Sequence, residues 1–297
     1  MPQQTAVLKL DASERERLEA ALQGGIFEFR SVPHAVFSAK GDGVVVTLYR
    51  SGKLVVQGAD PTAFTARYLD RVPEEKREEP IAGVPTDREL IGGDESGKGD
   101  FIGPLAVAAI RVAPRDLARL TEGGVMDSKK ISDKKILQMG PALRAYFPHA
   151  VEVLEPPEYN AAHARLRNVN LILAEAYERV VGELAEPGST VVIDQFARDK
   201  AVLNRALAPL KVELFQAHRA ERNPAVAAAS VLAREAFLLG LARLGEEFGV
   251  DLDKGAGDPA QAAARRFVDL HGMEQLPRVA KVHFANTQKL TRDGGPG

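Results

Sequence analysis

The first seventy residues alternate between short strand-like and helix-like hydrophobic patterns. Segments with the two-residue period of half-buried strands cover residues 6–10, 27–40, 43–50 and 53–59. Residues 11–24 and 61–72 instead repeat apolar positions every three to four residues, as amphipathic helices do. Asp11 or Ser13 is the expected N-cap of the first helix. The pattern predicts a small α+β domain over residues 1–72.

From residue 88 onwards, strand and helix patterns alternate. The expected strands are residues 89–95, 104–113, 150–155, 189–196 and 212–218. The expected helices are residues 132–147, with a break or kink at Gly140-Pro141, one long helix over 156–184, and residues 223–248 and 258–272. Asn223 and Pro224 are the N-cap and first residue of the third helix. This order predicts an α/β fold with a mixed sheet flanked by helices.

Residues 73–87 separate the two patterns. They are charged, contain Pro and have no hydrophobic period, which is typical of a linker. We therefore expect a second domain over residues 88–292, followed by a disordered tail over residues 293–297.

The stretch "IGGDESGKGD" at residues 91–100 has the glycine and lysine spacing of a phosphate-binding P-loop. A P-loop needs a Ser or Thr after the lysine to bind Mg²⁺, and this chain has Gly99 there. It also needs a helix to follow, whereas Pro104 and an apolar, β-branched run predict a strand. Asp94 and Glu95 would moreover repel a polyphosphate. The two acids, and not the glycine cradle, become the candidate chemistry.

Composition narrows the classes of chemistry. The chain has 297 residues, 45% hydrophobic and 27% charged, with a net charge of −2, so it does not hold nucleic acid by bulk charge, although a local basic groove remains open. It has no Cys, which excludes disulfides and thiolate chemistry. There is no signal-peptide pattern, and we expect no membrane-spanning run. The expected location is the cytoplasm.

Strand order predicts where the acids meet. Asp94 lies on the first strand of the second domain, and Asp194 ends the strand reached by a helical crossover. If these strands are parallel neighbours, their carboxylates lie together at one sheet edge. Glu221 precedes the helix at 223–248. Taken singly, each acid is as readily an exposed pair, a turn residue or a surface residue near a helix N-terminus.

These blocks together resemble the type 2 ribonucleases H. The resemblance rests on "DESGKGD" from Asp94, "VVIDQF" with Asp194 at the end of its apolar strand, "MDSKKIS", and an acid ahead of "AAASVLAR". Because that acid is Glu221, the chain resembles the ribonuclease HIII group, and residues 1–72 are similar to its TATA-binding-protein-like substrate-binding domain. The resemblance implies a monomeric endoribonuclease that cuts the RNA strand of RNA–DNA hybrids, leaving 5′-phosphate and 3′-hydroxyl ends.

The same resemblance implies the roles of the site residues. Asp94, Glu95, Asp194 and Glu221 are the expected catalytic residues and the ligands of two Mg²⁺ or Mn²⁺ ions. The Gly-Lys-Gly turn lets backbone approach a ribose 2′-hydroxyl, and Lys98 is suited to a phosphate. The expected substrate contacts are Ser96, Gly97, Lys98, Gly99, Ser128, Lys129, Lys130, Ser230 and Arg234.

Two departures from the family pattern stand out. His163 is present where a Tyr is expected, and Ala176-Tyr177 where His-Asn is common. Both are expected to affect helix-surface contacts and not the chemistry.

Two other functions remain to be separated from this one. A nucleic-acid-binding protein with an inactive nuclease fold is disfavoured because all four acids are present. A transposase-like or junction-resolving nuclease shares the fold and metals, but the Gly-Lys-Gly turn and the D-S-K-K block favour ribonuclease H.

Overall fold

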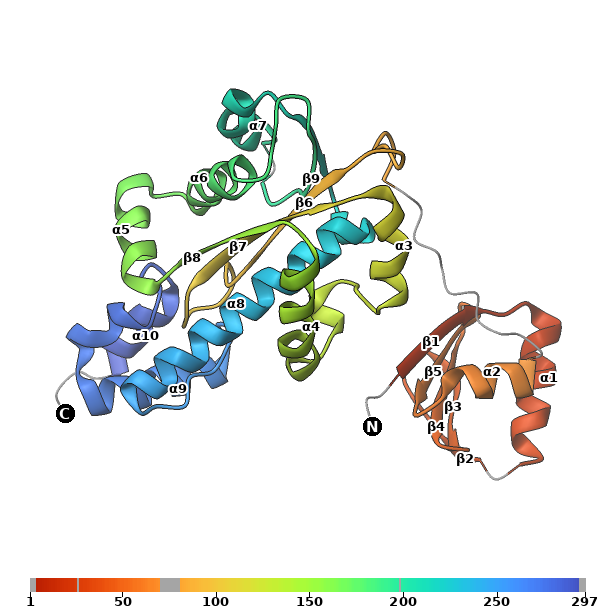
Figure 1. Ribbon diagram of the computed structural model, residues 1–297. Coiled ribbons are helices and arrows are strands. Elements are labelled where there is room, and N and C mark those ends of the chain that lie inside the picture. The colour runs from red at the N-terminus through yellow and green to blue at the C-terminus, as the bar shows by residue number, and fades with distance from the viewer. Residues whose placement is uncertain (1–3, 26, 70–80, 198, 294–297) are drawn as a thin grey trace. The chain divides into compact units, whose positions relative to one another are not determined.

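The computed structural model describes residues 4–25, 27–69, 81–197 and 199–293 (Figure 1). The chain divides into two compact units, Met1–Glu78 and Glu79–Gly297. Residues 73–80 of the expected linker and 294–297 of the expected tail lie outside the described residues.

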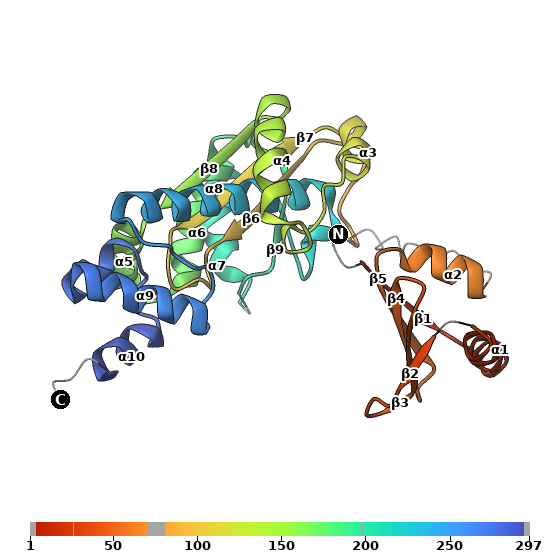
Figure 2. The same cartoon turned by 90° about the horizontal axis from the view of Figure 1, so that it is seen from below.

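The first unit is a five-stranded antiparallel sheet with two helices on one face (Figure 2). Its elements are β1 (Gln4–Lys9), α1 (Ala12–Gln23), β2 (Glu28–Arg30), β3 (Ala35–Gly41), β4 (Val44–Tyr49), β5 (Lys53–Gly58) and α2 (Pro61–Leu69). The sheet order is β1-β5-β4-β3-β2. Asp11 is the N-cap of α1 and forms a capping box with Glu14. The single strand expected over residues 27–40 is wrong, because the chain turns at His34 (φ 64°) between β2 and β3.

The second unit contains a five-stranded mixed sheet in the order β10-β9-β6-β7-β8. Its strands are β6 (Leu90–Ser96), β7 (Leu105–Val112), β8 (His149–Leu154), β9 (Thr190–Asp194) and β10 (Glu213–Ala217). β6 pairs antiparallel with β7 and parallel with β9. The mixed α/β architecture predicted from the sequence is confirmed.

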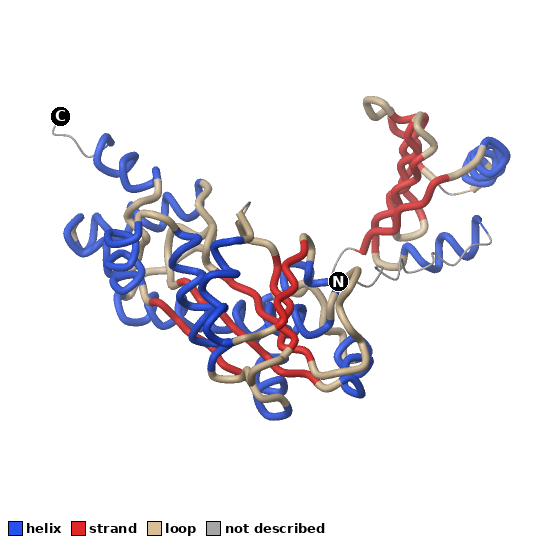
Figure 3. The backbone as a smooth tube through the Cα atoms, turned by 90° about the horizontal axis from the view of Figure 1, so that it is seen from above, coloured by secondary structure: helices blue, strands red, loops and turns tan. Residues whose placement is uncertain are grey.

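Helices cover both faces of this sheet (Figure 3). They are α3 (Pro114–Glu122), α4 (Asp133–Tyr146), α5 (Pro156–Leu166), α6 (Val169–Gly182), α7 (Ala201–Leu207), α8 (Pro224–Phe248), α9 (Asp258–His271) and α10 (Ala285–Asp293). The 3₁₀ turns are Ser128–Lys130, Ala208–Leu210, Ala220–Arg222 and Met273–Arg278. Successive residues of a strand point to opposite faces of the sheet. Leu90 accordingly packs in the hydrophobic cluster that contains α8, and Ile91 packs in the cluster that contains α6.

Two helix predictions differ from the structure. The long helix expected over residues 156–184 is wrong, because Arg167 adopts a left-handed conformation (φ 51°) and Asn168 caps a new helix, α6. Of the break or kink expected at Gly140-Pro141, the break does not occur, since α4 continues through both residues. Gly140 is needed there for packing, because a Cβ would lie 2.2 Å from Glu235 Oε2.

Helix α8 is the central helix of the second unit. By length and composition, this helix could cross a bilayer. The expectation that the chain has no apolar run of that length is therefore wrong. However, 78% of its most apolar window is buried inside the protein. Its hydrophobicity is accounted for by packing on the sheet.

Candidate active site

Asp94 and Asp194 come together because of the strand register. β6 and β9 are parallel neighbours in which Gly93 lies opposite Ile193, so the next residues of the two strands are Asp94 and Asp194. The predicted meeting of these two carboxylates at one sheet edge is thereby explained by backbone pairing alone.

Two glycines let helices approach β6 just before the acids. A Cβ on Gly92 would lie 2.2 Å from the backbone of Ala225, at the start of α8. On the opposite face, a Cβ on Gly93 would lie 3.0 Å from the Tyr177 ring. The Gly-Gly pair therefore packs both faces of the strand tightly at the acid cluster.

The acid cluster carries unfavourable negative charge. Burial, followed by the charge of Glu95 and then Asp194, raises the pKa of Asp94 well above its ordinary value. Burial also raises the pKa of Glu95, although Tyr177 and Lys98 act in the opposite direction. Lys129 lowers both pKa values, but only in part. Such repulsion between buried carboxylates is relieved by a cation.

Protein donors hold three of the carboxylates. Asp94 Oδ1 accepts from the Glu95 N–H at 2.9 Å, and Asp194 Oδ1 accepts from the Ala220 N–H at 2.9 Å. Glu95 Oε2 accepts from the Tyr177 hydroxyl at 2.6 Å. The expectation that Tyr177 affects only helix-surface contacts is wrong, because its side chain is fully buried against Glu95.

Glu221 lies in the 3₁₀ turn Ala220–Arg222, directly before α8. The Ala220 N–H that binds Asp194 belongs to the same turn, so the turn carrying Glu221 is tied to the end of β9. Asn223 caps α8 and Pro224 is its first residue, as predicted. The fourth acid is thus brought to the carboxyl end of the central strands.

The glycine-lysine loop has two different glycines. Gly97 has φ 92°, and a Cβ there would lie 2.2 Å from the Pro104 carbonyl, so the turn requires glycine. Gly99 is exposed and has open space around it. Lys98 faces the acids: its Nζ lies 3.8 Å from Glu95 Oε1 and donates to the Phe196 carbonyl at 3.1 Å. The Lys98 side chain therefore points toward the acids, whereas the backbone of Gly99 is exposed to solvent.

The C-terminal segment braces this loop. Lys281 is fully buried, and its Nζ donates to the carbonyls of Asp100 (2.9 Å) and Gly103 (2.6 Å). The Asp100 carboxylate accepts from the Gly255 N–H at 2.6 Å, and Gly103 N–H donates to Val279 at 2.8 Å. The loop shape therefore depends on residues far away in sequence.

The burial of Lys281 is expected to make the stability of the protein depend on pH. Burial lowers its pKa from 10.5 to about 7, against the small opposite effect of Asp100. Between about pH 7 and pH 10 the unfolded chain binds a proton that the folded chain does not, so the free energy of unfolding rises with pH by a few kcal/mol. Chemical denaturation at pH 7 and pH 9 is expected to show this gain in the wild type and not in Lys281→Met. Lys289→Met, at an exposed lysine, is the control and should show the same rise in the free energy of unfolding as the wild type. If both variants lost this rise, Lys281 would not be its source.

The D-S-K-K block is held by α8. Ser128 N–H donates to Ser230 Oγ at 3.1 Å, and Ser230 Oγ donates to the Ala227 carbonyl. Both serines are buried, which fits a role in fixing the block. Lys129 and Lys130 follow in the same 3₁₀ turn and are exposed.

Arg234 lies one helical turn after Ser230. Its guanidinium donates to Asp133 at 3.2 Å, and Asp133 also pairs with Lys254. Arg234 Nε is buried without a partner. The Arg234 side chain is therefore bound to α4 through Asp133, and its Nε–H remains without a hydrogen-bond acceptor.

The donor set suits a hard divalent cation. Its members are all carboxylates, which Mg²⁺ and Mn²⁺ favour, and their mutual repulsion leaves charge for a cation to neutralise. Among the described residues, no three acidic or His side chains yet converge on one point as ligands. Tyr177, the Ala220 amide and the Glu95 amide each hold one oxygen of a carboxylate. We conclude that the residues fit the ion, which would bind the carboxylate oxygens that these donors leave open.

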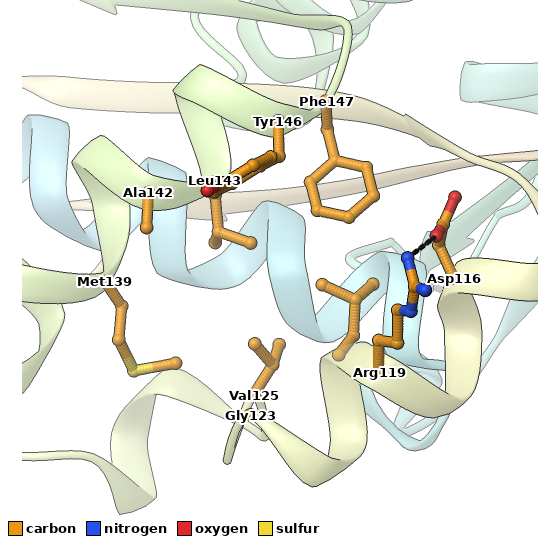
Figure 4. A pocket seen from close by; sticks show the side chains of 10 residues that line it. Asp116, Arg119, Gly123, Val125, Met139, Ala142, Leu143, Tyr146 and Phe147 are labelled. Atoms are coloured by element: carbon orange, nitrogen blue, oxygen red, sulfur yellow. Dashed lines mark hydrogen bonds and ion pairs between the residues drawn. The ribbon is translucent and has the colours of Figure 1, made fainter.

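A separate pocket lies between α3 and α4 (Figure 4). Its volume is about 460 Å³. It is lined by Asp116, Arg119, Leu120, Gly123, Val125, Met139, Ala142, Leu143, Tyr146 and Phe147. None of the predicted site residues lines it, so it is not the catalytic site.

Comparisons with known proteins find relatives over nearly the whole chain. The model of the family Ribonuclease HII matches residues 91–287, and that of a domain of unknown function (DUF3378) matches residues 5–80. Ribonuclease HIII of Chlamydia pneumoniae is 38% identical over 96% of this chain and 97% of its own, and that of Protochlamydia amoebophila is 37% identical over 94% of each. The crystal structure of Bst-RNase HIII in complex with Mn²⁺ matches with a TM-score of 0.67 and 31% identity, covering 98% of this chain and 99% of that one. The chain belongs to the ribonuclease HIII family.

Proposed function

We propose that this protein is an endoribonuclease that hydrolyses the RNA strand of RNA–DNA hybrids at the acid cluster. The observation that carries the proposal is the parallel register of β6 and β9, which places Asp94 beside Asp194 with Glu95 and the Glu221 turn around them. Family membership supplies the reaction, and products with 5′-phosphate and 3′-hydroxyl ends are expected.

The proposed metal ligands are the four carboxylates Asp94, Glu95, Asp194 and Glu221. Two Mg²⁺ or Mn²⁺ ions bound there would activate the attacking water and neutralise charge on the leaving oxygen. The side chains of the protein do the remaining work. Asp94 and Asp194 set the position of the site through the sheet, and the turn at Gly97 brings backbone and Lys98 to its rim.

The proposed substrate contacts fall into two groups. Exposed groups that can meet the hybrid directly are Gly99, Lys129 and Lys130. Ser96 ends β6, and Gly97 and Lys98 belong to the loop that carries Gly99. Ser128, Ser230 and Arg234 are instead held by other protein groups and act by placing their neighbours. A Lys98 amine released from Glu95 by a bound cation would be available to a phosphate.

The first unit is proposed to bind the hybrid through the open face of its sheet. The register places Lys9 opposite Lys53 on this face. Lys40 and Arg30 lie there too, together with Glu28, which is opposite Lys40 and pairs with Arg30. Like charges directly opposite each other are destabilising in a sheet, and an anionic backbone would relieve them. The part of this face around Lys9 and Lys53 is therefore suited to phosphates.

Removal of residues 1–80 is expected to raise KM for a hybrid by about 10-fold and to leave kcat similar, because a second binding module adds affinity without touching the chemistry. The second unit has its own hydrophobic clusters, so it should remain folded. Steady-state kinetics on a hybrid measure both constants. A thousand-fold fall in kcat with unchanged KM would place the first unit in the active site instead.

We also propose a monomer acting in the cytoplasm without membrane attachment. The chain has no Cys and so needs no oxidising compartment for disulfide formation. Light scattering of the purified protein should give the mass of one chain, and fractionation of cells should place it in the soluble fraction.

The experiment that tests the function is a cleavage assay on three duplexes. An RNA–DNA hybrid should be cut in the presence of Mg²⁺ or Mn²⁺, and a DNA duplex and a branched DNA junction should not. Binding to the hybrid without cleavage would indicate an inactive nuclease fold, and junction cleavage would indicate a resolving nuclease.

A further inference from the structure

Tyr177 lies next to the acid cluster on the α6 face of the sheet. It is fully buried, and its hydroxyl donates to Glu95 Oε2 at 2.6 Å. A phenol is protonated at neutral pH and donates a single hydrogen bond. Glu95 therefore has one carboxylate oxygen fixed by a neutral donor.

Packing fixes the position of this hydroxyl. Phe196 stacks parallel to the Tyr177 ring, with centroids 5.5 Å apart and an interplanar angle of 10°. On another side, the absence of a side chain at Gly93 leaves the room that the ring occupies. The ring is held between β6 and the residue two positions after Asp194, so the donor is tied to both acid-bearing strands.

The second oxygen of Glu95 has a weaker partner. Oε1 lies 3.8 Å from Lys98 Nζ, which is beyond hydrogen-bond distance, and Lys98 donates to the Phe196 carbonyl instead. The side chain of Glu95 is 11% exposed. One oxygen is thus held by Tyr177, and the other is left for a different ligand.

We infer that Tyr177 is a positioning residue for metal binding, which holds Glu95 so that its second oxygen is presented to a divalent cation. This inference rests on the proposed function only in taking Glu95 as a metal ligand. Groups that hydrogen-bond to metal ligands typically contribute about 10- to 100-fold to metal affinity or activity.

The test is Tyr177→Phe, which removes the hydroxyl and keeps the ring stacked on Phe196. Calorimetric titration of the full chain with Mn²⁺ is expected to show about 10-fold weaker binding. The Mn²⁺ concentration for half-maximal cleavage should rise by a similar factor, whereas KM for the hybrid at saturating Mn²⁺ should not change. The matched control is Tyr159→Phe, because Tyr159 is equally buried and its hydroxyl has no partner. This control is expected to bind Mn²⁺ as the wild type does.

A second variant tests the same role by another route. Phe196→Leu keeps the Tyr177 hydroxyl but removes the stacked ring that fixes it, so Mn²⁺ binding should weaken by a smaller factor. Unchanged Mn²⁺ affinity in a folded Tyr177→Phe, or an equal loss in Tyr159→Phe, would overturn the inference. A wild type that binds Mn²⁺ and does not cut hybrids would contradict the proposed function instead.

Discussion

Asp94→Asn and Glu95→Gln are each expected to lower kcat on an RNA–DNA hybrid by about a thousand-fold or more, which corresponds to ~4 kcal/mol of transition-state stabilisation. Both changes keep the size of the side chain and remove its charge. Because the acids are proposed to hold metal, whereas the loop and basic side chains hold substrate, hybrid binding should survive.

Single-turnover kinetics with Mg²⁺ and fluorescence anisotropy of a labelled hybrid measure the two effects separately. Asp269→Asn, on the exposed side of α9, is the matched control and should be fully active. EDTA should stop the wild type, and added zinc should not be needed. Near-normal turnover of either acid variant would contradict the metal site at β6.

A run of ribonucleotides is expected to be cut about 100-fold more efficiently, in kcat/KM, than a single ribonucleotide in duplex DNA. The family resemblance implies that ribonuclease HII enzymes use a late Tyr at an RNA-to-DNA junction, and the last Tyr of this chain, Tyr177, is buried against Glu95. Phe237 and Phe267 are fully buried in the core. Recognition must then come from several successive 2′-hydroxyls, and losing two such hydrogen bonds costs ~3 kcal/mol.

Two labelled duplexes test this preference, one with a run of about four or more ribonucleotides, a length on the order of the contact footprint, and one with a single ribonucleotide. A DNA duplex of the same sequence is the control. Equal kcat/KM on the two substrates would show that another residue takes the role of the late Tyr. Phe196 would then be the first candidate, because its ring lies two residues after Asp194.

The central geometry was predictable because it follows from strand periodicity. Asp94 and Asp194 end apolar runs joined by a crossover, so parallel pairing could be anticipated, and Asn223-Pro224 marked the start of α8 after Glu221. Motif resemblance, and not periodicity, singled out the acids among the many charged residues.

Other features could not be predicted because their cause lies in tertiary contacts. Arg167 ends α5 in a left-handed conformation that a non-glycine sequence does not signal. Tyr177 occupies an apolar helix position, where the pattern indicates burial but not the Glu95 partner. Lys281 is a charged residue between apolar neighbours, and the carbonyls that accept from its amine come from residues far away in sequence.

The bracing of the Gly97 loop has a consequence for the synthesis of the protein. The loop is synthesised before its partners Gly255, Val279 and Lys281, which all follow the fourth acid, Glu221, in the sequence. A nascent or prematurely terminated chain therefore lacks the groups that shape the catalytic loop, even when all four acids are already present. Nuclease activity is therefore expected only after these later residues have been made and have folded onto the loop.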